Sequence, residues 1–141
     1  MFKLTKIEGG RINVFEPEIL PVGGTRVVDG QALVLSDGVL VDANGAKPTF
    51  IAISDCEANQ EVAVGRVADN QVYEVALSAT PGTGVKVGVQ LTTSKKSVTA
   101  NGTTTQHTMF VTATAGEGGV AEVVSLNGAT KSGDKVLVRF S

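Results

Sequence analysis

The chain has 141 residues, of which 42% are hydrophobic and 18% charged, and its formal net charge is −2 at pH 7. This length suits one domain or two very small ones, and the composition is sufficient to bury a core. The near-neutral balance argues against a general nucleic-acid binder, which needs a concentrated basic surface. The sequence contains no apolar run of about 18 residues, the length that would predict a membrane-spanning helix.

The first 24 residues differ in composition from the rest of the chain. Their apolar residues are interrupted by Gly9, Gly10, Pro17, Pro21, Gly23 and Gly24. Proline disfavours helix and favours extended backbone. We therefore expect residues 1–24 to form an extended N-terminal arm, with Phe2, Leu4, Ile7 and Phe15 as its apolar anchors. The alternative is that this segment holds a first edge strand of the domain.

Residues 25–141 have the pattern of an all-β domain. Dipeptides that tolerate positive φ, and so favour tight hairpin turns, occur at Asn44-Gly45, Asn101-Gly102 and Asn127-Gly128, with related signals at Asp29-Gly30 and Asp37-Gly38. The expected strands are residues 31–35, 39–42, 49–53, 61–67, 71–77, 85–91, 109–114, 120–125 and 135–140. No segment predicts a convincing helix. Short strands at this spacing indicate an antiparallel β-sandwich or a barrel-like domain.

A possible internal repeat relates residues 31–67 to residues 89–126. The matched positions are Asn44-Gly45 with Asn101-Gly102 and Phe50 with Phe110. A duplication would give two similar β-lobes, residues 25–80 and 81–141. Any two β-meanders can look alike, so a chance match stays open as the alternative.

The stretch from Thr92 to Thr114 is rich in threonine and contains Lys95-Lys96. Threonine is common in exposed strands. Within this stretch we expect residues 103–107 to be a mobile polar loop tip, because such tips carry small polar residues.

The single cysteine, Cys56, rules out an internal disulfide framework, and the opening MFKLTKIEGGR lacks the apolar core of a signal peptide. We therefore expect synthesis in a reducing cytoplasm. A Cys–His mechanism would need the only imidazole, His107, to reach Cys56. Asp55 and Glu57 flank Cys56, and their carboxylates would raise the pKa of the thiol. We expect no catalytic residues.

One cysteine and one histidine cannot form a structural zinc site. Carboxylates gather in sequence at Asp37, Asp42, Asp55, Glu57 and Glu61, without the spacing of an EF-hand loop. Solvated turn carboxylates are the expectation, and a calcium site stays open as the alternative. The segment GEGG at residues 116–119 lacks the pattern of a phosphate-binding loop and is expected to be a turn. No cofactor is predicted.

The order of three sequence segments in the first half of the chain resembles that of a known family. Residues 29–41 read DGQALVLSDGVLV, residues 49–53 read TFIAI and residues 61–64 read EVAV. This order of hairpin, aromatic-led strand, acidic loop and valine strand resembles the capsid decoration proteins of tailed bacteriophages, also called cement or head-stabilisation proteins. The resemblance covers about residues 25–77.

The resemblance implies a structural protein of the virion, made in the host cytoplasm and bound to the capsid exterior. Such proteins bridge neighbouring subunits of the major capsid protein, typically as homotrimers, and need neither nucleic acid nor membrane as a partner. It also implies that the arm, through Phe2, Leu4, Ile7 and Phe15, contacts the capsid. Three alternatives remain: a tail or head-fibre protein, a surface or carbohydrate-binding module, and an enzyme whose site forms only on folding.

Overall fold

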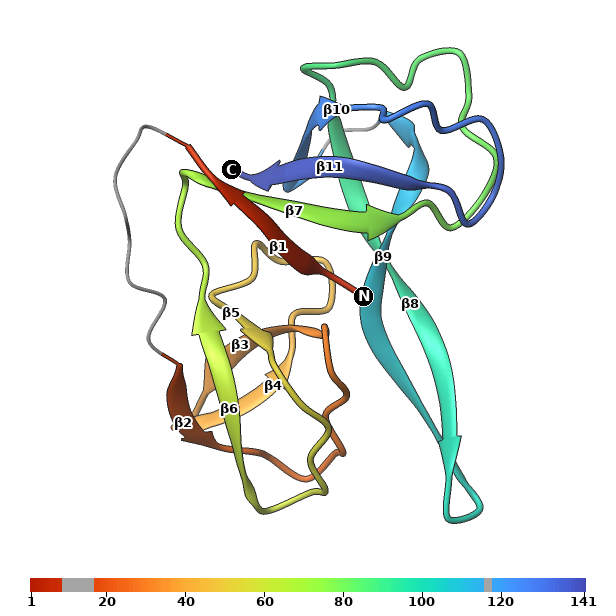
Figure 1. Cartoon of the computed structure of the whole chain (residues 1–141). Helices are drawn as coiled ribbons and strands as arrows, with labels where there is room; N and C mark the ends of the chain where they lie inside the picture. Colours follow the sequence, from red (N-terminus) through yellow and green to blue (C-terminus); the bar gives the residue numbers. More distant parts are fainter. Residues whose placement is uncertain (9–16, 116–117) are drawn as a thin grey trace.

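The computed structural model describes residues 1–8, 17–115 and 118–141, and within them the protein is all-β (Figure 1). Five strands form one sheet in the order β2 (Glu18–Pro21), β6 (Glu61–Arg66), β5 (Phe50–Ala52), β3 (Ala32–Ser36) and β4 (Val39–Asp42). Six strands form the other in the order β1 (Lys3–Ile7), β7 (Gln71–Ala76), β11 (Lys135–Phe140), β10 (Ala121–Ser125), β8 (Gln90–Ala100) and β9 (Thr103–Ala115). No described residue belongs to a helix that could cross a membrane.

The five-stranded sheet curls until its two edges meet. The residue after β2, Val22, forms a parallel bridge with Leu40 of β4, and the amide of Gly23 donates to the carbonyl oxygen of Leu40 at 3.0 Å. The enclosed core is aliphatic around one ring, that of Phe50. We call this unit, β2 to β6, the first lobe.

The six-stranded sheet closes in a similar way. Leu77, the residue after β7, forms a parallel bridge with Val111 of β9, and the amide of Ser78 donates to the Val111 carbonyl oxygen at 2.9 Å. Its core contains two tilted aromatic contacts, with Phe140 centred 5.2 Å from Phe2 and 5.4 Å from Tyr73. We call β7 to β11, together with β1, the second lobe.

The two lobes share one strand order. Counted along the chain from β2 or from β7, the first, fifth, fourth, second and third strands are neighbours, and the first and third meet at the closure. The boundary lies between β6 and β7, so residues 71–76, which the sequence assigned to a first lobe of residues 25–80, belong to the second.

The likeness does not follow the residue matches expected from sequence. Asn101-Gly102 joins β8 to β9, the place that Asp37-Gly38 occupies between β3 and β4, whereas Asn44-Gly45 follows β4. Phe50 begins β5, but Phe110 lies inside β9. The proposed residue alignment is therefore wrong, because the β8–β9 hairpin is much longer than its counterpart.

Residues 1–24 do not form a free arm where they are described. β1 pairs with β7 in the second lobe, and β2 pairs with β6 in the first. Phe2 is only 2% exposed, because it packs in the second core, and its amide donates to the Gly30 carbonyl oxygen at 2.9 Å. The edge-strand alternative therefore describes these residues, and residues 9–16 lie outside the described chain.

Most turns and strands follow the sequence prediction. Asp37, Asn44, Asn101 and Asn127 all have positive φ, as does the glycine after each of them. Residues 85–91 are an exception, because only Gln90 and Leu91 lie in a strand, and Gly88, at φ 92°, interrupts the run. Residues 103–107 are another, because they belong to β9 and not to a loop tip.

Candidate functional site

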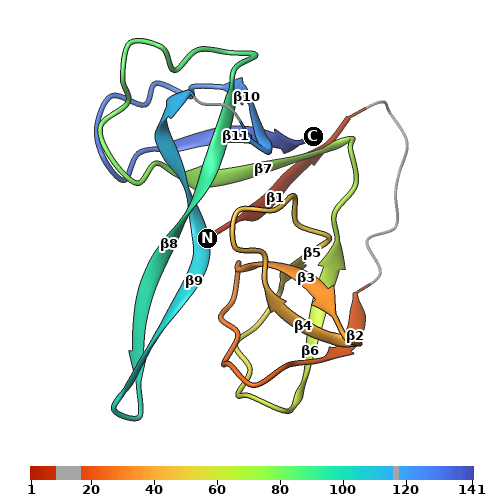
Figure 2. The ribbon, with the colours of Figure 1, turned by 180° about the vertical axis from the view of Figure 1, so that it is seen from behind.

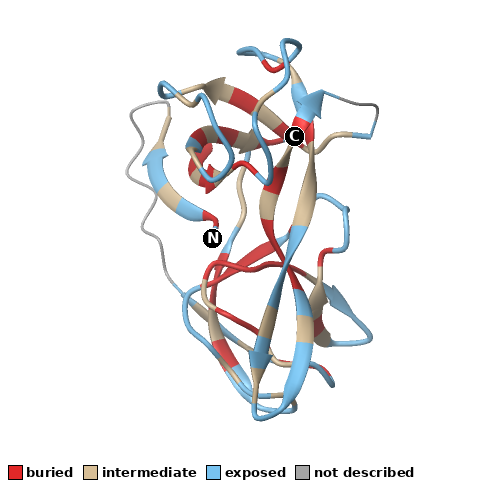
Figure 3. Cartoon of the chain, turned by 90° about the vertical axis from the view of Figure 1, so that its right-hand side faces the viewer, coloured by how far each residue is buried: buried red, intermediate tan, exposed pale blue. Residues whose placement is uncertain are grey.

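The β8–β9 hairpin extends past its own sheet and lies beside the first lobe (Figures 1 and 2). β8 pairs with β10 only at Gln90 and Leu91, and β9 meets the end of β7 near Val111. We call residues 95–108, the part of the hairpin nearest its turn, the ribbon. Its tip is exposed, whereas buried residues mark the place where β9 crosses the first lobe (Figure 3).

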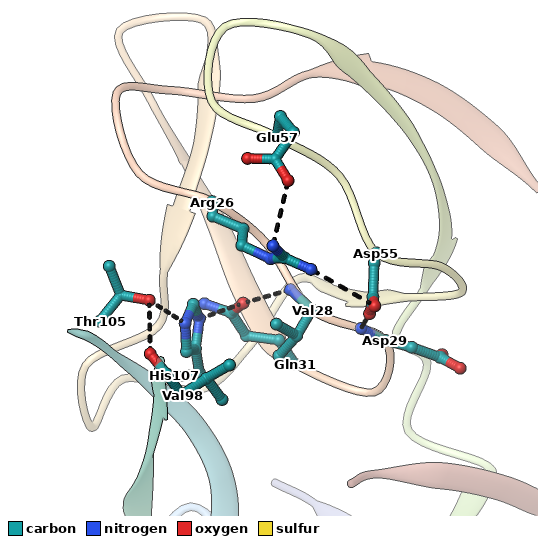
Figure 4. Close-up of polar contacts among 9 residues, drawn as sticks. All are labelled: Arg26, Val28, Asp29, Gln31, Asp55, Glu57, Val98, Thr105 and His107. Atoms are coloured by element: carbon teal, nitrogen blue, oxygen red, sulfur yellow. Dashed lines mark hydrogen bonds and ion pairs between the residues drawn. The ribbon is translucent and has the colours of Figure 1, made fainter. Parts of the chain in front are cut away.

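We call the contact region between the ribbon and the first lobe the junction. Its central contact joins His107 on β9 to Gln31, just before β3 (Figure 4). His107 is 0% exposed, and its Nδ1 lies 2.8 Å from Gln31 Oε1. The same oxygen accepts from the amide of Val28 at 3.0 Å, so the network assigns the Nδ1 proton to His107. The other ring nitrogen, Nε2, accepts from the Thr105 hydroxyl at 2.6 Å. Both ring nitrogens are therefore occupied.

Asp42, at the end of β4, extends this contact into a network. Its Oδ1 accepts from Gln31 Nε2 at 3.0 Å and from the Thr108 amide at 2.7 Å. Its Oδ2 accepts from the Thr108 hydroxyl at 2.7 Å and from the Asn44 amide at 2.9 Å. Because hydrogen bonds to an ionised group are among the stronger ones, this carboxylate fixes the ribbon to the first lobe.

Burial is the main influence on the imidazole. It lowers the pKa of His107, with Arg26 acting in the same direction, while the carboxylates of Asp42 and Asp55 oppose the shift. The neutral ring therefore predominates at pH 7. It can act as a fixed donor and acceptor, but its lone pair is already used by Thr105.

A second polar layer surrounds Arg26. Its guanidinium donates to Glu57 Oε1 at 3.0 Å and pairs with Asp55 Oδ2 at 3.6 Å (Figure 4). Asp55 also accepts from the amide of Asp29 at 2.8 Å. A cleft of about 390 Å³ separates this layer from the ribbon tip and is lined by Gly24, Thr25, Arg26, Glu57, Ala58, Ala100, Asn101, Thr103 and Thr105.

The structure does not bring Cys56 and His107 together as a bonded pair. The Cys56 thiol faces the carbonyl oxygens of Glu57 and Glu61, at 3.3 and 3.4 Å. Burial and the Glu57 carboxylate raise the pKa of the thiol, the direction predicted from the sequence. The thiolate needed for nucleophilic chemistry is therefore scarce at neutral pH.

The acidic residues singled out in the sequence are dispersed. Asp42 binds the ribbon, Asp55 and Glu57 bind Arg26, and Asp37 occupies a turn. The described part of the chain holds no group of three or more His, Cys, Asp or Glu side chains placed to share a metal ion.

Only a glycine fits at position 119 without a steric clash. A Cβ there would lie 2.8 Å from the backbone carbon of Gln90, so the chain passes close to β8 at this point. Gly118, with φ 77°, makes the turn before it.

Two of the four predicted arm anchors lie on one strand. Leu4 and Ile7 on β1 lie opposite Tyr73 and Gln71 of β7 and are partly buried. Phe2 is in the core, so it cannot meet a capsid in this conformation. Phe15 lies outside the described residues.

Sequence reasoning missed the junction. Gln31, Asp42 and Thr108 carry no motif, and His107 is 76 residues from Gln31. The one available signal was a histidine two residues before Met109, in a strand-like segment. No family model, curated protein or solved structure matches this chain.

Proposed function

We propose that this protein is a structural component of a tailed-phage virion that binds the outer surface of the capsid. It stabilises the shell by bridging neighbouring subunits of the major capsid protein, as a homotrimer. The proposal extends the resemblance of residues 25–77, a segment that contains β3 to β6 of the first lobe as well as β7. It involves no catalysis, nucleic acid or membrane.

One observation supports this proposal above the others: the side chains best suited to chemistry are already bound to other groups of the protein. His107, Gln31 and Asp42 bond to one another or to the ribbon, and Arg26 is paired with carboxylates. A protein that must resist the internal pressure of a filled shell needs such a rigid body. An enzyme would need at least one of these groups to be free for its substrate.

Exposed aliphatic residues provide this rigid protein with a surface for contacts to a partner. Ile19 on β2 is 60% exposed and lies opposite Ala63 of β6, whose carbonyl oxygen accepts from the amide of Ile53. The three residues therefore form a row across neighbouring strands of the first lobe. Aliphatic surface of this kind suits a protein partner better than a sugar, which usually stacks on aromatic rings.

The test is binding to shells assembled from the major capsid protein of a tailed phage that carries this chain. The purified protein is mixed with unexpanded and with expanded shells, sedimented and quantified, and the disruption temperature of the shells is measured. Co-sedimentation with expanded shells and a higher disruption temperature are expected. Absence of binding to both kinds of shell overturns the proposal.

The alternatives have their own signatures in the same preparation. Self-assembly into tubes or fibres would indicate a tail or head-fibre protein. Retention on immobilised glycans would indicate a carbohydrate-binding module. Light scattering gives the mass of the unbound protein, for which three copies are expected.

A further inference from the structure

The outer edge of β8 is open along the ribbon. Within the described residues, β9 is the only strand that pairs with β8 from Lys95 to Ala100. β9 lies on the side of the first lobe, and β8 lies on the side away from it in both views (Figures 1 and 2). Lys95, Lys96, Ser97 and Thr99 are exposed.

The hairpin geometry tells which amides point outward from this edge. Asn101 and Gly102, both with positive φ, form a two-residue turn, so the flanking pair Ala100 and Thr103 is hydrogen-bonded. Hydrogen-bonded and non-bonded pairs alternate along an antiparallel ladder. The pairs of Lys95, Ser97 and Thr99 with β9 are therefore of the second kind, and their N–H and C=O groups point away from β9.

An independent contact supports this assignment. Thr108, the partner of Lys95 in the ladder, donates its amide to Asp42 of the first lobe and not to β8. The outward amide of Thr108 on β9 thus faces the first lobe, whereas no described residue hydrogen-bonds to the outward backbone groups of Lys95, Ser97 and Thr99 on β8. An open edge of this kind is a template for an added strand.

The charge of this edge indicates what kind of strand fits. Lys95 lies 3.9 Å from Asp42, and Lys96 forms no ion pair with any described residue. An added strand with carboxylates would pair with these cations. A second copy of β8 would bring its own two lysines to the same ladder, which is unfavourable for like charges.

We propose that the open edge of β8, from Lys95 to Thr99, binds an extended acidic segment of a partner protein by strand addition. The backbone groups of Lys95, Ser97 and Thr99 supply the hydrogen bonds, and Lys96 supplies the charge preference. On the proposed function, which names the capsid protein as partner, this segment belongs to that protein.

The first test needs no shell. Backbone amides of the intact protein are followed by NMR while a short peptide of alternating threonine and glutamate is added, with a threonine–lysine peptide as the control. The acidic peptide is expected to slow hydrogen exchange at Ser97 and Thr99 by about tenfold, the factor that roughly one net hydrogen bond provides. Equal effects of both peptides, or changes confined to other residues, overturn the proposal.

Two matched variants separate the edge from the fold of the ribbon. Ser97→Pro removes an outward amide from β8, and Gln106→Pro removes one from the facing residue of β9. Both variants lose the hydrogen bond from Gln106 Nε2 to the Ser97 hydroxyl, but only Ser97→Pro is expected to abolish binding of the acidic peptide. Lys96→Glu leaves the backbone intact and is expected to lose binding of the acidic peptide too, so the proposal stays testable if the proline variants unfold.

Shell binding then distinguishes the two proposals. If the unmodified protein binds expanded shells and Ser97→Pro and Lys96→Glu bind equally well, strand addition at β8 is wrong and the proposed function stands. If the peptide binds the edge but no shell is bound, the capsid is the wrong partner. Stronger self-association of Lys96→Glu without loss of peptide binding would mean that the lysine only guards the edge against aggregation.

Discussion

The two lobes have the same strand order and differ mainly in one hairpin. In the first lobe β3 and β4 have 5 and 4 residues, whereas the corresponding β8 and β9 have 11 and 13. The short hairpin ends within its lobe. The long one leaves its lobe, crosses to the other and is fixed there by His107 and Thr108.

This difference shows how a small β-protein with a single cysteine can join two lobes through one long hairpin. Each lobe alone has a small core, and small cores contribute little stability. The ribbon adds buried polar contacts between the lobes. We therefore expect the two lobes to unfold as one unit, linked by the ribbon and by Ala32, Ala43 and Ile51 of the first lobe, which pack in the core of the second.

The largest expected effect on stability comes from removing a buried aromatic ring from either core. Phe140→Ala in the second lobe and Phe50→Ala in the first should each lower the free energy of unfolding by about 3–5 kcal/mol, since both rings are fully buried. Denaturant titration should show one transition in both variants. Two resolved transitions, with only the mutated lobe shifted, would contradict the linked-lobe account. Ile19→Ala, at an exposed position, is the control.

The next largest effect concerns the link itself. Asp42→Ala should cost about 3 kcal/mol, because the buried donors of Thr108 and Gln31 lose their acceptor. The hydrogen-exchange rates of the ribbon amides should rise more than those of the β11 amides. Asp69→Ala is the control, since Asp69 forms only an exposed ion pair with Lys47 and should change stability by less than about 0.5 kcal/mol. A uniform rise in exchange would mean that Asp42 supports the whole fold and not the link.

A smaller effect depends on pH. The pKa of His107 is lower in the folded protein than in the unfolded chain, so folding favours the neutral ring. Its stabilising contribution is complete above the unfolded pKa of about 6.5 and is lost as pH falls through the lower folded value. Unfolding titrations should therefore show a steeper loss below pH 6.5 in the unmodified protein than in His107→Gln. Parallel curves for the two proteins would contradict the assignment of a buried neutral imidazole.

The smallest effect is expected at Cys56. Because burial and Glu57 raise the pKa of its thiol, Cys56 should react with a disulfide reagent more slowly than a model peptide thiol at pH 8. Cys56→Ser should change stability by less than about 1 kcal/mol, because a hydroxyl can make the same contacts with backbone carbonyls. A rate above that of the peptide would show that the thiol is activated.

The sequence predicted the first lobe much better than the ribbon. β3 to β6 combine alternating or apolar runs with Asp-Gly and Asn-Gly turns, and these signals are local. The ribbon is rich in threonine and lysine, so it lacks the apolar alternation that identifies a half-buried strand. Burial of His107 depends on Gln31, which is distant in sequence, and no local pattern could show it.

The sequence could not decide between an arm and an edge strand for a related reason. The prolines correctly indicated extended backbone at β2, but extended backbone can be an arm or an edge strand. The ladder of β1 with β7 and the burial of Phe2 against Phe140 decide between them, and both are long-range contacts.

The most direct test of the proposed function is an electron cryomicroscopy reconstruction of expanded shells saturated with this protein. The account predicts three copies around each three-fold or quasi-three-fold position on the outer surface, with the open edge of β8 against a strand of the capsid protein. Outer surfaces without added density, or density only at the portal and tail, would contradict it.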